Sequence, residues 1–191
     1  MRYFMFLLLG LVLSATSADA HGLPGDPAGV AAGFAHPFAG LDHMLAMIAV
    51  GLWSALAGGH ARWAWPATFV ALMAVGYALG LGGAPLPWIE HAVFASVVAL
   101  GLLVTLAMRL PVAGGALVVG LFALFHGHAH GAEAPLGDPR LYAIGFMLAT
   151  AALHGVGLAL GHLPSATWGR VPARILGGAV AVAGVMLTFL A

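Results

Sequence analysis

Histidines and carboxylates recur in three separate segments of an otherwise apolar sequence. Imidazole combined with carboxylate suits borderline divalent metals such as nickel, cobalt and zinc, and it suits calcium or magnesium poorly. We therefore predict a binding site for a divalent transition metal, with no catalytic residue and no resident prosthetic group. The candidate metal ligands are His36, Asp42, His43, Glu90, His126, His130 and Glu133.

Spacing along the chain relates several of these residues. His126, His130 and Glu133 are four and three positions apart, which predicts one stripe on a continuing helix. His128 lies about 200° around that helix from His126 and is expected to point elsewhere. Asp42, buried alone in lipid, would cost several kcal/mol, so it needs a cation, an arginine or a proton as its partner.

The composition indicates what must position these residues. Hydrophobic residues make up 62% of the 191 residues and charged residues only 6%, whereas a soluble domain carries about 25% charged residues. The expected solvent is therefore the lipid bilayer. Six arginines balance six acids, and lysine is absent, which leaves no basic surface for nucleic acid. Without cysteine there are no thiolate metal ligands, and without a Walker-type loop the chain does not hydrolyse ATP itself, so we expect no enzyme.

The first twenty residues predict a secretory signal peptide. Arg2 precedes a short apolar run over residues 4–13, and Ala18-Asp19-Ala20 supplies small residues at the cleavage positions. Cleavage there would make His21 the first residue of the mature chain, with an amine and an imidazole that can chelate together. An uncleaved first helix is the alternative.

Residues 21–191 are predicted to form one all-α domain, a bundle of six transmembrane helices. Pro37 favours the first helical position, so His36 is expected to cap the first span at its outer mouth. Glycine pairs four residues apart, Gly76/Gly80 and Gly157/Gly161, predict close packing of helices or dimerisation. The six spans, each near the roughly 20 residues needed to cross a bilayer, are predicted at about 37–57, 63–81, 88–108, 112–130, 141–161 and 174–190.

Arginines give the orientation, because positively charged loops stay in the cytoplasm. Four of them follow or precede spans on one side of the predicted topology, and only Arg140 falls on the other. Both mature termini are therefore predicted outside, and the candidate ligands gather at the outer face. His154 lies deeper in the fifth span, either as a station on an inward path or as a helix–helix hydrogen-bond donor. Aromatic residues at predicted span ends, typical of interfacial belts, are Trp63, Trp65, Trp88, Tyr142 and Trp168.

Two segments resemble the signatures of a known family. Residues 36–47, HPFAGLDHMLAM, resemble the first-helix signature of the HupE/UreJ family of hydrogenase and urease accessory membrane proteins, and residues 125–133, FHGHAHGAE, are similar to its second signature. The resemblance implies a nickel permease of the bacterial inner membrane that serves a [NiFe] hydrogenase or a urease. It carries site roles to His36, Asp42, His43, His126, His130 and Glu133, whereas Glu90 rests on its depth and charge.

Several alternatives stay open at this point. Some relatives in this group are associated with cobalt, so nickel and cobalt both remain candidate cargoes. The chain could also be the metal-binding membrane subunit of an energy-coupling transporter, an assembly factor for a metalloenzyme that transports nothing, or a haem-binding membrane protein. A homo-oligomer is compatible with the small helix faces.

Overall fold

The computed structural model describes residues 29–162 and 169–190, and these residues form helices with no strand among them. The predicted signal peptide, His21 and Trp168 lie outside the described residues. The helices are α2 (Val30–Ala39), α3 (Leu41–Ala57), α4 (Ala61–Leu81), α5 (Ile89–Thr105), α6 (Val112–Ala132), α7 (Pro139–His162) and α8 (Val171–Leu190). The all-α prediction is confirmed for this part of the chain.

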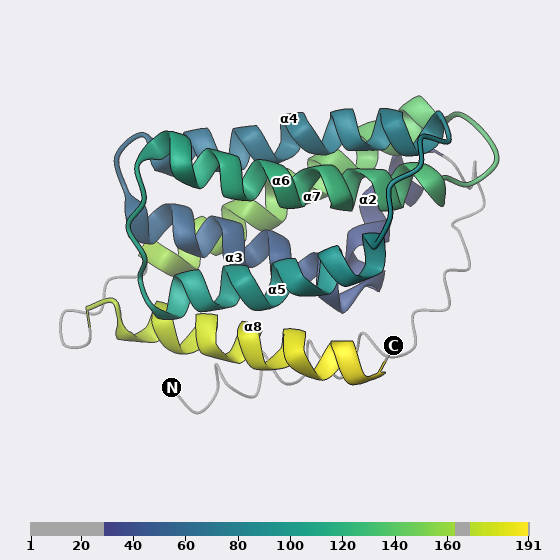
Figure 1. Ribbon diagram of the computed structural model, residues 1–191. Helices are drawn as coiled ribbons and strands as arrows, with labels where there is room; N and C mark the ends of the chain where they lie inside the picture. Colours follow the sequence, from purple (N-terminus) through teal and green to yellow (C-terminus); the bar gives the residue numbers. More distant parts are fainter. Residues whose placement is uncertain (1–28, 163–168, 191) are drawn as a thin grey trace.

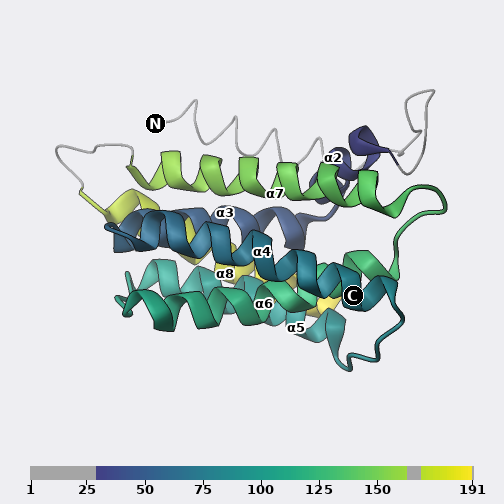
Figure 2. The same cartoon turned by 90° about the horizontal axis from the view of Figure 1, so that it is seen from above.

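The long helices lie side by side along one common direction, and the short α2 sits at one end of the bundle beside α7 (Figures 1 and 2). Four of them, α4, α6, α7 and α8, are long and apolar enough to cross a membrane. The bent pair α2 and α3 makes a fifth candidate span, and α5 is apolar but has only 17 residues. Residues 29–162 and 169–190 thus contain four to five candidate spans by length and composition, as expected of a helical, multi-pass membrane protein.

The prediction for the start of the first span was wrong. Instead of one helix from Pro37, the chain forms α2 with Pro37 inside it, and the axes of α2 and α3 differ by 90°. His36 therefore lies in the last turn of α2 and caps no span. The break lies at Gly40, whose backbone is extended, with φ −104° and ψ 115°. A Cβ there would lie 2.9 Å from both Asp42 Oδ1 and His43 Nδ1, so a larger residue would displace these two side chains.

Glycines bring the helix backbones into direct contact, as the glycine pairs predicted. On α4, Gly76 and Gly80 face the backbone of α6 at Leu124 and His128. On α7, Gly157 faces α3 at Ile48 and Gly51. A side chain at any of these glycines would overlap the neighbouring backbone, which shows that α4–α6 and α3–α7 are packed through small residues.

Arginines mark one end of the bundle, and histidines mark the other. Four arginines lie where α3 meets α4, α5 meets α6, and α8 begins; they are Arg62, Arg109, Arg170 and Arg174. Arg140, at the start of α7, lies at the opposite end, where α6 finishes. The charge asymmetry on which the predicted orientation depends is therefore present in the fold.

The predicted aromatic belt is only partly present. Trp63 and Trp88 are exposed, with 69% and 73% of their surfaces accessible, as expected at an interface. Trp65 and Tyr142 are buried instead. The Trp65 indole N–H donates to the carbonyl of Val112 at 2.9 Å, which ties the start of α4 to the start of α6.

Candidate metal-binding site

Four histidines from three helices lie ring against ring at the end of the bundle where α2 bends into α3. His43 is central: its ring centroid lies 4.5 Å from that of His130 and 5.0 Å from that of His126. His36 on α2 approaches His130 from the other side, at 4.8 Å. We call His36, His43, His126 and His130, together with Asp42, the outer cluster. The break at Gly40 is what lets α2 and α3 deliver His36 and His43 to the same two side chains of α6.

Asp42 orients His43. The Nδ1–H of His43 donates to Asp42 Oδ1 at 2.9 Å, and both side chains are less than one-fifth exposed. This bond fixes the tautomer, so the Nε2 atom carries the free lone pair. Nε2 is buried and has no hydrogen-bond partner among the described residues. A carboxylate behind an imidazole is the usual arrangement around metal-binding histidines, where it raises the basicity of the ligand.

Ser96 orients His126 in a similar way, which the sequence did not reveal. The Ser96 hydroxyl donates its single proton to the carbonyl of Val93 at 2.6 Å, so the oxygen accepts from His126 Nε2–H at 2.9 Å. The lone pair of His126 is thereby left on Nδ1, which is buried and lacks a hydrogen-bond partner within the described chain. The sequence around Ser96 does not indicate this role, because the histidine that it contacts lies 30 residues away.

His130 supplies a third free nitrogen. Its ring is only 2% exposed and lies against the ring of Phe146, with 4.9 Å between the ring centroids. His130 Nε2 also has no partner in the described part of the chain. Buried polar atoms in proteins are hydrogen-bonded in the great majority, so three such nitrogens on contacting rings need an explanation. A metal ion that visits the cluster would supply the missing partner.

As they stand, the described residues contain no three His, Asp or Glu side chains that would hold one metal ion together. The rings of the outer cluster contact one another without pointing three nitrogens at a common centre. Binding an ion would therefore require some of these rings to turn. His36 and His43 are the half-buried members, and they have the most freedom to do so.

The two remaining predicted ligands lie apart from the outer cluster. Glu90 is in the first turn of α5, and Glu133 directly follows α6; both are exposed. Glu133 is the C-cap of α6, and its backbone N–H still donates to the carbonyl of Ala129, so it follows the predicted stripe, but its side chain is exposed whereas His126 and His130 are buried. Both acids do belong to the histidine end of the bundle, at the start of α5 and the end of α6.

Other histidines have separate surroundings. His128 points away from the outer cluster as predicted, and its Nε2–H donates to the carbonyl of Ala84 at 2.6 Å. His91 is exposed and lies edge-on to Trp88, with ring centroids 5.5 Å apart. His60 and His162 are exposed at the arginine end. Among the described helices, none of these four histidines makes a ring contact with the outer cluster.

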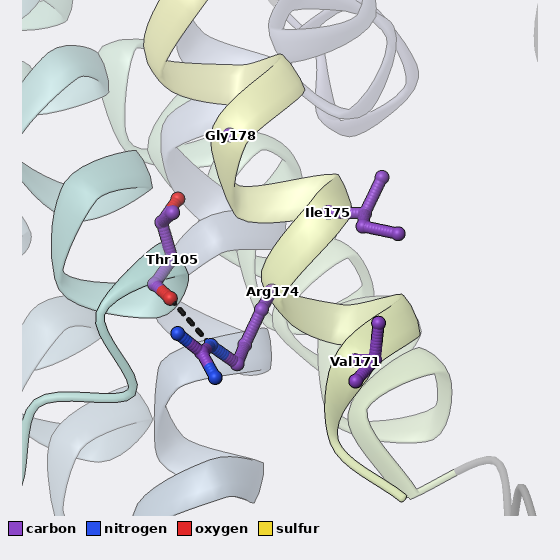
Figure 3. Close-up of a pocket in the computed structure, with 5 residues that line it drawn as sticks. All are labelled: Thr105, Val171, Arg174, Ile175 and Gly178. Carbon is purple, nitrogen blue, oxygen red and sulfur yellow. Dashed lines mark hydrogen bonds between the residues drawn. The ribbon is translucent and has the colours of Figure 1, made fainter. Parts of the chain in front are cut away.

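A shallow pocket lies at the other end of the bundle, between α5 and α8 (Figure 3). Its lining is mainly apolar, from Val171, Ile175 and Gly178 on α8. Arg174 closes one side by donating from Nε to the carbonyl of Thr105 at 2.7 Å. With no histidine or carboxylate in its lining, this pocket offers no ligand to a divalent metal.

Comparison with known proteins covers nearly the whole chain. The sequence model of the HupE / UreJ protein family matches residues 9–187, a range that contains every helix of the outer cluster. Among curated proteins, Protein HupE of Rhizobium leguminosarum bv. viciae is 48% identical over 172 residues, which cover 89% of this chain and 89% of that protein. No solved structure matches.

Proposed function

This chain belongs to the HupE / UreJ family, and from that premise we propose that it is a permease for a divalent transition-metal ion. The proposed cargo is nickel, taken up into the cytoplasm for the maturation of a [NiFe] hydrogenase or a urease. Cobalt is the alternative cargo, because the ligand chemistry of the cluster suits both metals.

One observation carries this proposal. The outer cluster presents three buried imidazole nitrogens without partners, His43 Nε2, His126 Nδ1 and His130 Nε2, on rings that touch. Neutral imidazole is a common ligand of nickel, cobalt and zinc. Asp42 is the only carboxylate in the cluster, and it stands behind His43. We therefore assign Asp42 the role of orienting the imidazole and offsetting the charge of the ion.

Capture of the ion begins at the surface and continues at the half-buried histidines. A hydrated dication arriving at the histidine end meets Glu90 and Glu133 at the surface, where exposed carboxylates attract cations. It then exchanges waters for imidazoles as His36 and His43 turn toward it. Neutral imidazoles with a single carboxylate bind a dication less tightly than several carboxylates would. Such binding suits a carrier, because the ion must also be released.

The proposed topology keeps six spans, formed by α3 to α8, with α2 lying at the outer surface. The arginine end faces the cytoplasm, and both mature termini lie in the periplasm of the bacterial inner membrane, after removal of residues 1–20. The membrane potential then drives the divalent cation inward, at about 2.3 kcal/mol per elementary charge for each 100 mV. No nucleotide hydrolysis by this chain is required.

Metal uptake by cells tests the proposal. Cells that lack other nickel uptake systems, expressing this chain alone, are expected to accumulate nickel at limiting concentrations and to lose accumulation when cobalt is added in excess. Magnesium in excess is expected to have no effect, since the hard cation prefers oxygen ligands.

The same cells separate the alternatives. Accumulation without any added partner excludes the energy-coupling subunit, which needs an ATPase. If nickel does not accumulate but hydrogenase or urease activity still depends on the chain, an assembly factor without transport is the correct function.

A further inference from the structure

One buried histidine lies inward of the outer cluster and has no assigned role. His154 on α7 is 1% exposed, and neither of its ring nitrogens has a hydrogen-bond partner among the described residues. The sequence left open a helix–helix hydrogen bond for this residue, and the structure contains none. An imidazole that is buried with both nitrogens unpaired is costly to the fold, so its retention points to a ligand.

His154 continues a file of rings that starts at the outer cluster. The ring of Phe69, fully buried on α4, contacts His126 on one side and His154 on the other, with ring centroids 5.7 Å and 5.1 Å apart. His126 in turn contacts His43, as described above. Phe69 thus lies between His126 of the outer cluster and His154, the next imidazole along the bundle.

Two methionine sulfurs lie close to Thr150, one helical turn before His154 on α7. The Thr150 hydroxyl lies 3.3 Å from Met47 Sδ and 3.8 Å from Met73 Sδ. Residues four apart share a face of a helix, so Thr150 and His154 face the same interior. Met73 is likewise four residues after Phe69 on α4. Three helices therefore place an imidazole, two thioethers and a hydroxyl around one fully buried region.

We propose that His154 is a second, inner metal-binding station, with the thioethers of Met47 and Met73 beside it and Phe69 as the divider from the outer cluster. The station would take borderline to soft transition-metal cations, because imidazole and thioether are the ligands those ions prefer. This inference rests on the proposed transport function. It adds a point at which the ion is held after leaving His126.

The charges around His154 define what kind of station it is. The ring of His154 contacts Phe69, and Thr150 one turn earlier contacts the sulfurs of Met47 and Met73. None of these four residues carries a charge. A dication there has no carboxylate to offset it, so it binds more weakly than at the outer cluster beside Asp42. A weak inner site passes the ion on, whereas a strong one would trap it.

Nickel uptake into proteoliposomes of the full chain tests the station kinetically. His154→Leu keeps the volume and removes both nitrogens; the maximal rate is expected to fall about tenfold, as for a higher barrier on the path. The nickel concentration for half-maximal uptake is expected to stay within twofold, since capture occurs at the outer cluster. His128→Gln is the matched control, because it also replaces a buried histidine but lies off the file of rings.

The outcomes are distinguishable. If the wild type transports nickel and His154→Leu transports it at the same maximal rate, the inner station is wrong and the permease assignment stands. If the wild type itself moves no nickel, the proposed function is overturned. A loss in His128→Gln equal to that in His154→Leu would assign the effect to packing and would also overturn the station.

A second variant covers the case in which His154→Leu does not fold. The chain has no cysteine, so His154→Cys introduces a single thiol at the station. Nickel is expected to slow alkylation of that thiol by a small membrane-permeant reagent several-fold, and magnesium is expected not to. Equal alkylation rates with and without nickel would overturn the station.

Discussion

Two regions of this bundle, the arginine end and the outer cluster, treat their buried polar groups in opposite ways. At the arginine end, side-chain donors close onto backbone carbonyls: Trp53 Nε1 donates to Met108 at 2.9 Å, and Trp65 Nε1 donates to Val112 at 2.9 Å. The first bond ties α3 to the chain that follows α5, and the second ties the start of α4 to the start of α6. These contacts hold helices together and leave few donors free, Arg62 Nε being one exception.

In the outer cluster, hydrogen bonds leave one lone pair free on each imidazole that they orient. Asp42 and Ser96 each occupy one nitrogen of an imidazole, and the other nitrogen of each ring stays without a partner. Bonds of this kind set the tautomer and contribute little to joining helices. The difference fits the proposed function, in which the arginine end serves the stability of the fold and the outer cluster binds the ion.

His43→Gln should have the largest effect, because His43 is the ring that contacts both His126 and His130. Loss of a direct ligand is expected to lower nickel uptake about 100-fold or more. Loss of a residue that only hydrogen-bonds to a ligand costs about 10- to 100-fold, and loss of the ligand itself should cost at least as much. Uptake by whole cells at limiting nickel measures this. His60→Gln, at the opposite end, is the control; uptake within twofold of wild type in His43→Gln would remove His43 from the site.

Asp42→Asn should have the next largest effect. An amide can still accept from His43 Nδ1–H, but it no longer offsets the charge of a bound cation. The expected loss is about 10- to 100-fold in apparent affinity for nickel, the range for groups behind metal-binding histidines. The half-saturation concentration for uptake measures it. An unchanged affinity would mean that the carboxylate serves packing alone.

Ser96→Ala should have a smaller effect, about tenfold in apparent affinity, because it frees His126 Nε2 without removing the ring. The structural basis is the fixed tautomer: without the serine oxygen, the proton of His126 can move to Nδ1 and block the proposed ligand atom. Thr105→Ala removes a hydroxyl that bonds only its own helix and serves as the control. Equal uptake by Ser96→Ala and wild type would contradict the tautomer argument.

Trp53→Phe should affect stability and leave transport unchanged. It removes the N–H donated to the Met108 carbonyl, and we expect a loss of about 1 kcal/mol in the free energy of unfolding. Thermal unfolding in detergent, together with uptake normalised to folded protein, measures both quantities. A fall in normalised uptake would show that the arginine end takes part in transport and would break the contrast between the two ends.

Much of this architecture could be predicted from the sequence because lipid imposes simple rules. Continuous apolar stretches predict helices α3 to α8, and the positions of the arginines distinguish the two ends. His43, His126 and His130 were expected on one side of the membrane for the same reason. Such inferences need only the length of a span and the sign of a charge.

Other features depend on contacts that spacing does not encode. The break at Gly40 was missed because Pro37 looked like the first residue of a helix, whereas the apolar residues before it extend α2 upstream. Ser96 was missed because its role depends on the packing of α5 against α6. The exposure of the Glu133 side chain was missed because a short apolar pattern does not fix where a helix stops.

The central claim is that the outer cluster binds the transported ion, and reconstituted transport tests it most directly. Purified wild-type protein in proteoliposomes, with an inward-directed nickel gradient and an inside-negative potential, is expected to accumulate nickel in a saturable manner. Under the same conditions, correctly folded His43→Gln is expected to accumulate no more than protein-free liposomes. Saturable uptake by His43→Gln with wild-type affinity would contradict the account.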